Sequence, residues 1–201
     1  MTIIAFISQK GGVGKSTLSQ ALTIEARKQK LKVLLADCDP QQSTSYEWSK
    51  IKQKVNCQVF NLVKEVWPLT KQYDLLIIDG PARTSKSTLE IAQKADLIIQ
   101  PTGASRADLV PAVKEFNALK KAGIPPKKLL FVLTRLSTLA EAKAIQEYLK
   151  KTGYACSPHY IMEKASYKQV QNEGKSIGEV SYTSLRKQVK GLITSLLDYL
   201  N

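Results

Sequence analysis

Apolar residues along this chain occur either in short uninterrupted runs or at helical spacing. Uninterrupted runs bounded by polar or turn residues are typical of buried strands, whereas apolar positions every three or four residues are typical of covering helices. The runs predict strands over residues 3–7, 31–36, 56–63, 73–79, 95–100 and 128–134. Helical spacing predicts helices over residues 18–29, 43–54, 106–121, 138–151, 165–173 and 182–200, and we assign no element to residues 64–72. This alternation predicts an α/β domain with a three-layer, doubly wound and mostly parallel sheet.

A glycine-rich stretch separates the first predicted strand from the first predicted helix. Residues 9–17 read Gln-Lys-Gly-Gly-Val-Gly-Lys-Ser-Thr. The glycines let the backbone curl so that successive N–H groups point at one centre, and the helix that follows adds the positive end of its dipole. Such a nest binds phosphate. We therefore expect a nucleoside triphosphate site formed by Lys10, Gly11, Gly12, Val13, Gly14, Lys15, Ser16 and Thr17.

Two side chains of this loop carry specific chemistry. Lys15 supplies a mobile positive charge for the β- and γ-phosphates, and the hydroxyl of Ser16 is placed to ligate Mg²⁺. The sequence therefore predicts a nucleoside triphosphate and Mg²⁺ as ligands of a P-loop NTPase, and the resemblance described below implies that the nucleotide is ATP.

Acidic residues stand where two of the later strands are predicted to end. Asp37 and Asp39 follow the strand over residues 31–36, and Asp79 ends the strand over residues 73–79. Ligands of parallel α/β sheets bind at the carboxyl ends of the strands. Carboxylates there suit a Mg²⁺-dependent hydrolase, because one can hold the water shell of the metal while another orients and deprotonates the attacking water. The alternative is that Asp37 and Asp39 only cap the next helix.

The loop departs from an ordinary phosphate loop at its start. Where the opening glycine is expected the chain has Gln9, and Lys10 follows it. The pattern Lys-Gly-Gly-x-Gly-Lys-Ser-Thr resembles the deviant Walker A loop of the ParA/MinD superfamily of ATPases. That resemblance implies that Lys10 crosses a dimer interface to the nucleotide of the partner, so that Lys10 and Lys15 both act in catalysis.

The later motifs resemble the same superfamily. Residues 37–41, Asp-Cys-Asp-Pro-Gln, are similar to its Walker A′ motif, and residues 73–79 are similar to its Walker B strand. By this resemblance, Asp39 positions the hydrolytic water and Asp37 supports the Mg²⁺ site. Asp79 hydrogen-bonds a water of the Mg²⁺ shell. Residues 80–87 resemble the switch region that reports the γ-phosphate.

The resemblance also implies where adenine binds. Relatives contact the base just after the strand that corresponds to residues 128–134 and in the loop after the next strand. Here those places lie near Thr134, Arg135, Ile161 and Met162, although the asparagine and proline usual there are absent.

Length and composition limit the number of domains and the cellular compartment that we expect. A length of 201 residues fits one domain, residues 1–201, and we expect no N-terminal helix-turn-helix domain because a strand begins at once. Three widely spaced cysteines indicate neither a disulfide framework nor a metal clamp, which favours the cytoplasm. No apolar run approaches the roughly 20 residues of a membrane helix, so we expect neither export nor a membrane span.

The charge of the chain points to a polyanionic partner. It has 30 Lys and Arg against 17 Asp and Glu, a net charge of +13, and the second half carries more of the excess. Clustered Lys and Arg bind DNA or an acidic membrane because counterions are released. The alternative is a merely solvated surface. The region that binds DNA in relatives supplies our candidates, Lys164, Lys168, Lys175 and Arg186.

Within the superfamily, the length and residues 100–109 are most similar to the small ParF-type plasmid partition ATPases. This similarity implies an ATP-dependent homodimer, non-specific DNA binding and slow ATP hydrolysis to ADP and phosphate. A small centromere-binding protein of the ParB or ParG type would stimulate hydrolysis, and the output would be plasmid or chromosome partition by a cytoplasmic, nucleoid-associated ATPase.

Three other interpretations belong to different classes. A MinD-like, membrane-associated or other cargo-positioning ATPase would use the basic amphipathic helix near the C-terminus as an anchor, although its apolar residues are those of a helix that packs on a sheet. A nucleotide-gated DNA scaffold would not need hydrolysis. A reductase like the nitrogenase iron protein is excluded, because no cysteine follows the Walker B strand where it could ligate a cluster.

Overall fold

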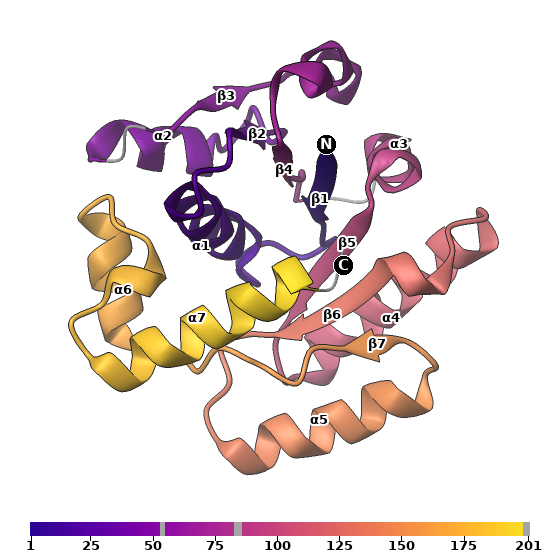
Figure 1. The fold of residues 1–201 in the computed structure, drawn as a ribbon. Coiled ribbons are helices and arrows are strands. Elements are labelled where there is room, and N and C mark those ends of the chain that lie inside the picture. The colour runs from indigo at the N-terminus through magenta and orange to yellow at the C-terminus, as the bar shows by residue number, and fades with distance from the viewer. Residues whose placement is uncertain (53–54, 83–85, 199–201) are drawn as a thin grey trace.

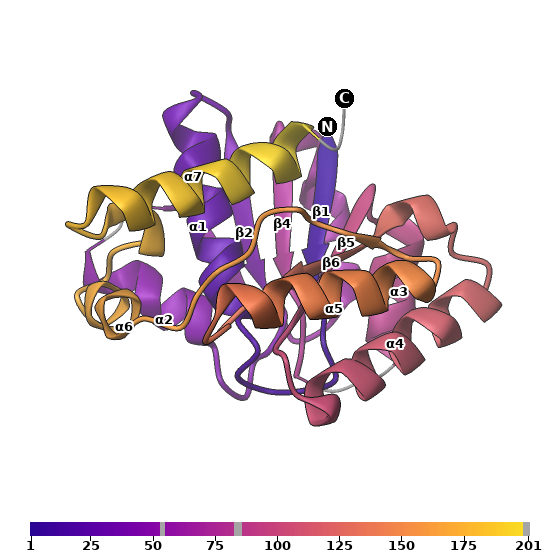
Figure 2. The same ribbon diagram turned by 90° about the horizontal axis from the view of Figure 1, so that it is seen from below.

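A parallel β-sheet forms the centre of the computed structural model, which describes residues 1–52, 55–82 and 86–198. Its seven strands have the order β3-β2-β4-β1-β5-β6-β7, and every neighbouring pair is parallel. The strands are β1 (Thr2–Phe6), β2 (Val33–Asp37), β3 (Cys57–Val59), β4 (Leu75–Asp79), β5 (Leu97–Thr102), β6 (Leu129–Leu133) and β7 (Ala155–Cys156). Helices cover both faces (Figures 1 and 2), so the predicted three-layer α/β class is confirmed.

Seven α-helices lie between or after these strands in the described part of the chain. They are α1 (Lys15–Lys28), α2 (Thr44–Ile51), α3 (Lys86–Lys94), α4 (Arg106–Lys121), α5 (Leu139–Lys151), α6 (Ala165–Asn172) and α7 (Thr183–Asp198). Short 3-10 helices lie at η1 (Val63–Glu65), η2 (Trp67–Gln72), η3 (Pro126–Lys128) and η4 (Ile177–Glu179). The sequence predicted neither α3 nor β7, and the segment left unassigned contains η1 and η2.

Alternation along the strands divides the interior into two apolar cores. In β1, Ile3 and Ala5 face one core while Ile4 and Phe6 face the other, because successive side chains of a strand point to opposite faces. One core is completed by α3, α4 and α5. The other is completed by α1, α2, α6 and α7. Each strand is therefore buried on both sides, which explains the uninterrupted apolar runs.

The C-terminal helix α7 packs on the sheet beside α1 (Figures 1 and 2). Val189, Leu192, Ile193 and Leu196 are each 0–1% exposed and belong to the same core as α1. The prediction that this helix packs is therefore confirmed over Thr183–Asp198. In the described part of the chain, no helix is long and apolar enough to cross a membrane.

Several boundaries differ from those predicted. Helix α1 begins at Lys15 and not at residue 18, because Gly14 adopts a left-handed conformation, with φ 101°, that starts the helix earlier. Strand β2 starts later than predicted and includes Asp37. The edge strand predicted over residues 56–63 is only Cys57–Val59. Three predicted segments reach residues 53–54, 83–85 and 199–200, which lie outside the described residues.

The register of the central strands sets the position of the site. Asp37 of β2 and Phe6 of β1 both pair with Asp79 of β4. The three strands therefore end at the same level. The loop before α1 and both strand-end carboxylates meet at this edge of the sheet.

Candidate functional site

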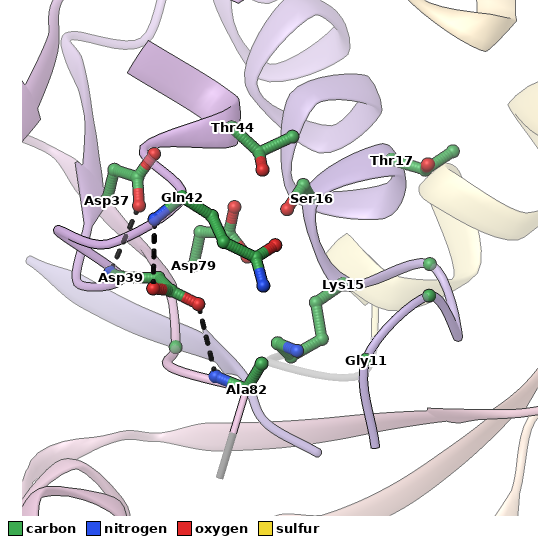
Figure 3. A pocket seen from close by; sticks show the side chains of 13 residues that line it. Gly11, Lys15, Ser16, Thr17, Asp37, Asp39, Gln42, Thr44, Asp79 and Ala82 are labelled. Carbon is green, nitrogen blue, oxygen red and sulfur yellow. Dashed lines mark hydrogen bonds between the residues drawn. The ribbon is translucent and has the colours of Figure 1, made fainter. Parts of the chain in front are cut away.

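The loop between β1 and α1 forms one wall of a cavity of about 190 Å³ (Figure 3). Gly12 and Gly14 have φ angles of 78° and 101°, which favour glycine and turn the loop back toward α1. Lys15 and Ser16 begin α1, so the helix N-terminus faces the cavity. Asp37, Asp39 and Asp79 line the same space, joined by Gln42 and Thr44, which the sequence did not single out.

Lys15 brings a buried positive charge to this cavity. Its exposed fraction is 8%, and Figure 3 shows its side chain between the glycine loop and the acidic residues. Burial lowers the pKa of Lys15, whereas the carboxylates of Asp79 and Asp39 act in the opposite direction. A cationic amine beside the backbone N–H groups of a glycine loop and a helix N-terminus suits a phosphate chain. Thr17 points away from the acidic residues, on another side of α1.

Asp79 is the most strongly perturbed carboxylate of the site. It is 2% exposed, and burial raises its pKa to about 6, although the hydrogen bond from Ser45, the nearby hydroxyl of Ser16 and the charge of Lys15 lower it. Its Oδ2 accepts a hydrogen bond of 2.7 Å from Ser45 Oγ. Within the described residues, its Oδ1 is buried and has no hydrogen-bond partner. A buried carboxylate oxygen of this kind calls for a partner such as a water, an ion or a ligand.

The residues around Asp79 fit a magnesium ion. Mg²⁺ prefers oxygen ligands and keeps several waters, so it needs few protein groups besides phosphate oxygens. The unpartnered Oδ1 of Asp79 and the hydroxyl of Ser16 are such oxygens on the wall of the phosphate cavity. No group of three or more His, Cys, Asp or Glu suited to a metal occurs among the described residues. A metal here would therefore depend on phosphate and water for the rest of its shell.

Asp37 makes the contacts of a helix cap. Its Oδ2 accepts from the backbone N–H groups of Ser45 and Tyr46 at 2.9 and 3.1 Å, at the start of α2. Its Oδ1 accepts from Asp39 N at 3.1 Å. Burial raises the pKa of Asp37 although these backbone bonds lower it. The capping alternative thus describes what Asp37 contacts, and its support of Mg²⁺ stays a prediction.

Asp39 joins two loops across the mouth of the cavity (Figure 3). Its Oδ1 accepts from Gln42 N and its Oδ2 from Ala82 N, both at 3.3 Å. The second bond crosses from the loop after β2 to the segment after β4. Asp39 therefore lines the phosphate cavity with two long hydrogen bonds, and its positioning of the hydrolytic water stays a prediction.

Lys10 lies outside the phosphate cavity of its own chain. Its ammonium group forms an ion pair with Asp108 Oδ1 in the first turn of α4, and 43% of its side chain is exposed. It is not one of the described residues that line the phosphate cavity. It lines a wider, open cavity of about 610 Å³ together with Asp39 and Ala82. Its action on the nucleotide of a partner stays a prediction.

The residues predicted near adenine lie together on the other side of the glycine loop. Thr134, Arg135, Ile161 and Met162 line a cavity of about 350 Å³ that we call the nucleoside pocket. Thr134 Oγ1 donates to Val13 O at 2.7 Å, and Arg135 Nη1 donates to Gly12 O at 3.0 Å. The pocket also includes Tyr167 and Gln171 of α6.

Three buried polar residues support the site and escaped the sequence analysis. Glu115 of α4 is 1% exposed and accepts from Gln9 N at 3.1 Å and from Gln100 Nε2 at 2.7 Å, so it holds the start of the glycine loop. Ser45 holds Asp79, and Gln20 lies behind Ser45. A glutamine among the apolar positions of the first helix was the one available indication, since helical spacing predicts its burial.

The candidate DNA-binding residues do not form one patch. Lys164 and Lys168 line the nucleoside pocket, and Lys168 pairs with Glu163 at 3.1 Å. Lys175 pairs with Glu173 at 2.6 Å. Arg186 lies elsewhere, in a groove of about 310 Å³ between α1 and α7. Its other basic residues are Lys28, Lys187 and Lys190.

Comparison with known proteins gives this geometry a context. The family model of the CobQ/CobB/MinD/ParA nucleotide binding domain matches residues 4–177. The uncharacterized protein BBD21 of Borreliella burgdorferi is 54% identical over 120 residues, which are 59% of this chain. The matched region spans 42% of the length of that relative.

Solved structures share the fold at low identity. An ATP complex of a McdA variant from Cyanothece has a TM-score of 0.75 at 21% identity, over 98% of this chain and 96% of that chain. A candidate plasmid partition protein from Borrelia burgdorferi, bound to AMPPNP, has a TM-score of 0.71 at 19% identity, over 97% and 99%. MinD of Pyrococcus horikoshii with Mg-ADP has a TM-score of 0.75 at 19% identity, over 97% and 95%.

Proposed function

The chain belongs to the CobQ/CobB/MinD/ParA family of nucleotide-binding domains, and from that premise we propose that it is an ATPase of DNA partition. It binds Mg-ATP in the phosphate cavity, dimerises around it, binds DNA non-specifically and hydrolyses ATP slowly. A small centromere-binding protein stimulates this hydrolysis. Structural neighbours that carry ATP, AMPPNP or Mg-ADP support the choice of nucleotide and metal. A candidate plasmid partition protein among them supports the choice of cargo.

One observation carries the proposal. The buried Oδ1 of Asp79 has no protein partner in the described chain and lies on the same cavity wall as the glycine loop and Lys15. Such an arrangement costs free energy unless a ligand completes it. A phosphate chain with a bound cation completes it, because the phosphates pair with Lys15 and the cation with Asp79.

Each residue of the site then has a role in hydrolysis. Lys15 and the backbone N–H groups of the loop hold the phosphates, and Lys10 of one subunit reaches the nucleotide of the other. Asp39 orients the attacking water. Mg²⁺, when bound, neutralises charge on the phosphate oxygens. The reaction depends mainly on positioning and charge stabilisation.

The helix α7 bears on the membrane alternative. A MinD-like anchor would need a free apolar face, but Val189, Leu192 and Leu196 are buried in the core with α1. The alternative predicts ATP-dependent liposome binding that is lost when residues 183–201 are removed. We expect no such binding.

Dimerisation tests the proposal directly. Light scattering should show a dimer with ATP and Mg²⁺ and a monomer with ADP. The Lys10→Ala variant should stay monomeric, whereas Lys143→Ala, which removes an exposed lysine of α5, should behave as wild type. A Lys10→Ala protein that dimerises and turns over ATP normally would contradict the proposal.

DNA binding is tested by its salt dependence. Random-sequence duplex should bind the ATP form, and removing one side chain that binds a DNA phosphate should lower the slope of log K against log salt by about one. Arg186 lies in a groove with three lysines, whereas Lys168 is paired with Glu163. We therefore expect Arg186→Ala to reduce the slope of log K against log salt more than Lys168→Ala does. If the Lys168→Ala/Arg186→Ala double variant binds DNA as tightly as wild type, these two residues are not part of the DNA-binding surface. Segregation that survives in Asp39→Ala would favour a scaffold that needs no hydrolysis.

A further inference from the structure

A line of hydrogen-bonded side chains runs from the nucleoside pocket to Asp79 behind the glycine loop. Gln171 Nε2 donates to Gln20 Oε1 at 3.1 Å, and Gln20 Nε2 donates to Ser45 Oγ at 3.4 Å. Ser45 Oγ then donates to Asp79 Oδ2 at 2.7 Å. These four residues, which we call the polar chain, come from α6, α1, α2 and β4.

The polar chain is buried over most of its length. Gln20 is 1% exposed, Ser45 is 0% exposed and Asp79 is 2% exposed. Gln20 lies on α1 between Leu18 and Leu22, which are both fully buried in the apolar core. Burying an amide costs free energy unless it is hydrogen-bonded at both ends. The two bonds of Gln20 therefore restrict its conformation strongly.

The bonds of the polar chain all run in one direction. Gln20 and Ser45 each accept from the neighbour on the side of the pocket and donate toward Asp79. Aligned hydrogen bonds of this kind polarise and orient one another. At the end of the line Asp79 Oδ2 accepts from Ser45, whereas Oδ1 has no partner in the described chain and is the more available oxygen for a cation.

The other end of the polar chain is the part that a ligand can reach. Gln171 is half-buried, lines the nucleoside pocket and also donates to Thr17 Oγ1 at 3.1 Å. A nucleoside in this pocket shields Gln171 from water and restricts its amide. Without a nucleoside, water competes for the amide, and Gln20 can lose the donor that orients it.

We propose that Gln20 and Ser45 are positioning residues that couple occupancy of the nucleoside pocket to the cation-facing carboxylate of Asp79. The inference rests on the proposed binding of a Mg-nucleotide. It goes further by making the strength of metal binding depend on whether the phosphates carry a nucleoside. A phosphate chain without a nucleoside would bind to the glycine loop but would not restrict Gln171 or, through it, Gln20.

Comparing the binding of ADP with that of inorganic pyrophosphate separates the effect of the nucleoside from that of the phosphate chain. Calorimetry on the full chain would give the dissociation constant of each probe in EDTA and in Mg²⁺, and the ratio of the two is the magnesium gain. Neither probe is hydrolysed or carries a γ-phosphate, so turnover and dimerisation do not interfere. Wild type should show a magnesium gain about fivefold larger for ADP than for pyrophosphate, the lower end of typical couplings between sites.

Two variants and a control test the route. Gln20→Met removes both bonds at similar volume, and Gln171→Leu removes the end that faces the pocket. Both should show equal magnesium gains for ADP and pyrophosphate while still binding ADP in EDTA. Thr23→Val is the control, because Thr23 is equally buried on α1 but donates only within its own helix, to Ser19 O at 2.8 Å. This control should keep the fivefold difference.

The outcomes are distinct. The inference is overturned if wild type has equal magnesium gains for ADP and pyrophosphate. It is also overturned if Gln20→Met keeps the fivefold difference between the two gains, or if Thr23→Val loses that difference. If circular dichroism shows that Gln20→Met does not fold, the Gln171→Leu variant at the half-buried end decides: equal magnesium gains for the two probes support the inference, and a fivefold difference overturns it. Failure to bind either ADP or ATP would refute the proposed function itself, whereas normal Mg-ADP binding with unchanged gains in the variants would refute only the coupling.

Discussion

Replacing Asp79 with asparagine should make the nucleotide-free protein more stable at neutral pH, although it removes a residue that the proposed function needs. Asp79 is buried, and its Oδ1 has no partner in the described chain. Asparagine keeps an oxygen that can accept from Ser45 and removes the charge. The substitution therefore relieves a cost that the folded protein bears while no ligand is bound.

The pKa of Asp79 gives the size and sign of the effect. Burial raises this pKa from 3.8 to about 6 in the folded state. A raised carboxyl pKa stabilises the fold fully below the unfolded value and loses that contribution as the pH rises through the folded value. Since each tenfold change in proton affinity is about 1.4 kcal/mol, the ionised form costs about 3 kcal/mol above pH 7 and roughly half of that at pH 5.

Thermal unfolding without nucleotide or metal, at pH 5 to 8, checks this expectation. At pH 7.5 the midpoint of Asp79→Asn should exceed that of wild type by about 6–12 °C, and the difference should shrink toward pH 5. Asp96→Asn, which changes an exposed carboxylate that accepts from Ile3 N at 2.8 Å, controls for the substitution itself. A midpoint for Asp79→Asn that is lower than wild type, or a difference independent of pH, would refute the reasoning.

Two further predictions concern other contacts. Asp108→Asn should release Lys10 from its ion pair, so dimerisation should need up to about fivefold less ATP, because ion pairs near the protein surface contribute at most about 1 kcal/mol. An unchanged ATP requirement for dimerisation, measured by light scattering, would contradict this. Gly174→Ala should lower the free energy of unfolding by about 2–4 kcal/mol, because a Cβ there would lie 2.7 Å from Ile51 Cβ and the residue has φ 71°. Gly123 has φ 91° and nothing within 4 Å of an added Cβ, so Gly123→Ala should lower the free energy of unfolding by only about 1 kcal/mol. Denaturant titration measures both variants, and equal losses would show that the contact with Ile51 is unimportant.

The order of motifs along the chain allowed the central part of the site to be predicted. Lys15 follows β1 after the glycine loop, and Asp79 is the last residue of β4. Parallel strands end at one edge of the sheet, so the order of these motifs sufficed to bring the two residues together. The same reasoning predicted most elements with long apolar patterns. It missed β7, whose two residues are too short for a pattern, and it assigned no helix to Lys86–Lys94.

The supporting polar residues could not be predicted in this way. Gln20 and Gln171 are 151 residues apart, and Gln20 and Ser45 are 25 apart, so their bonds exist only once α6, α1 and α2 are packed. Asp37 illustrates the same limit. Its place after a strand suited either a metal or a helix, and the position of α2 decides which groups it contacts.

The hydrogen bonds of Asp39 have a consequence for the timing of the reaction. Both of its oxygens already accept from backbone N–H groups, at 3.3 Å each. Each carboxylate oxygen keeps a second lone pair that can accept from a water. On its proposed role, Asp39 can therefore bind the attacking water while it still accepts from Ala82 N. Consumption of that water would then act directly on the residue that holds Ala82, without a separate sensor.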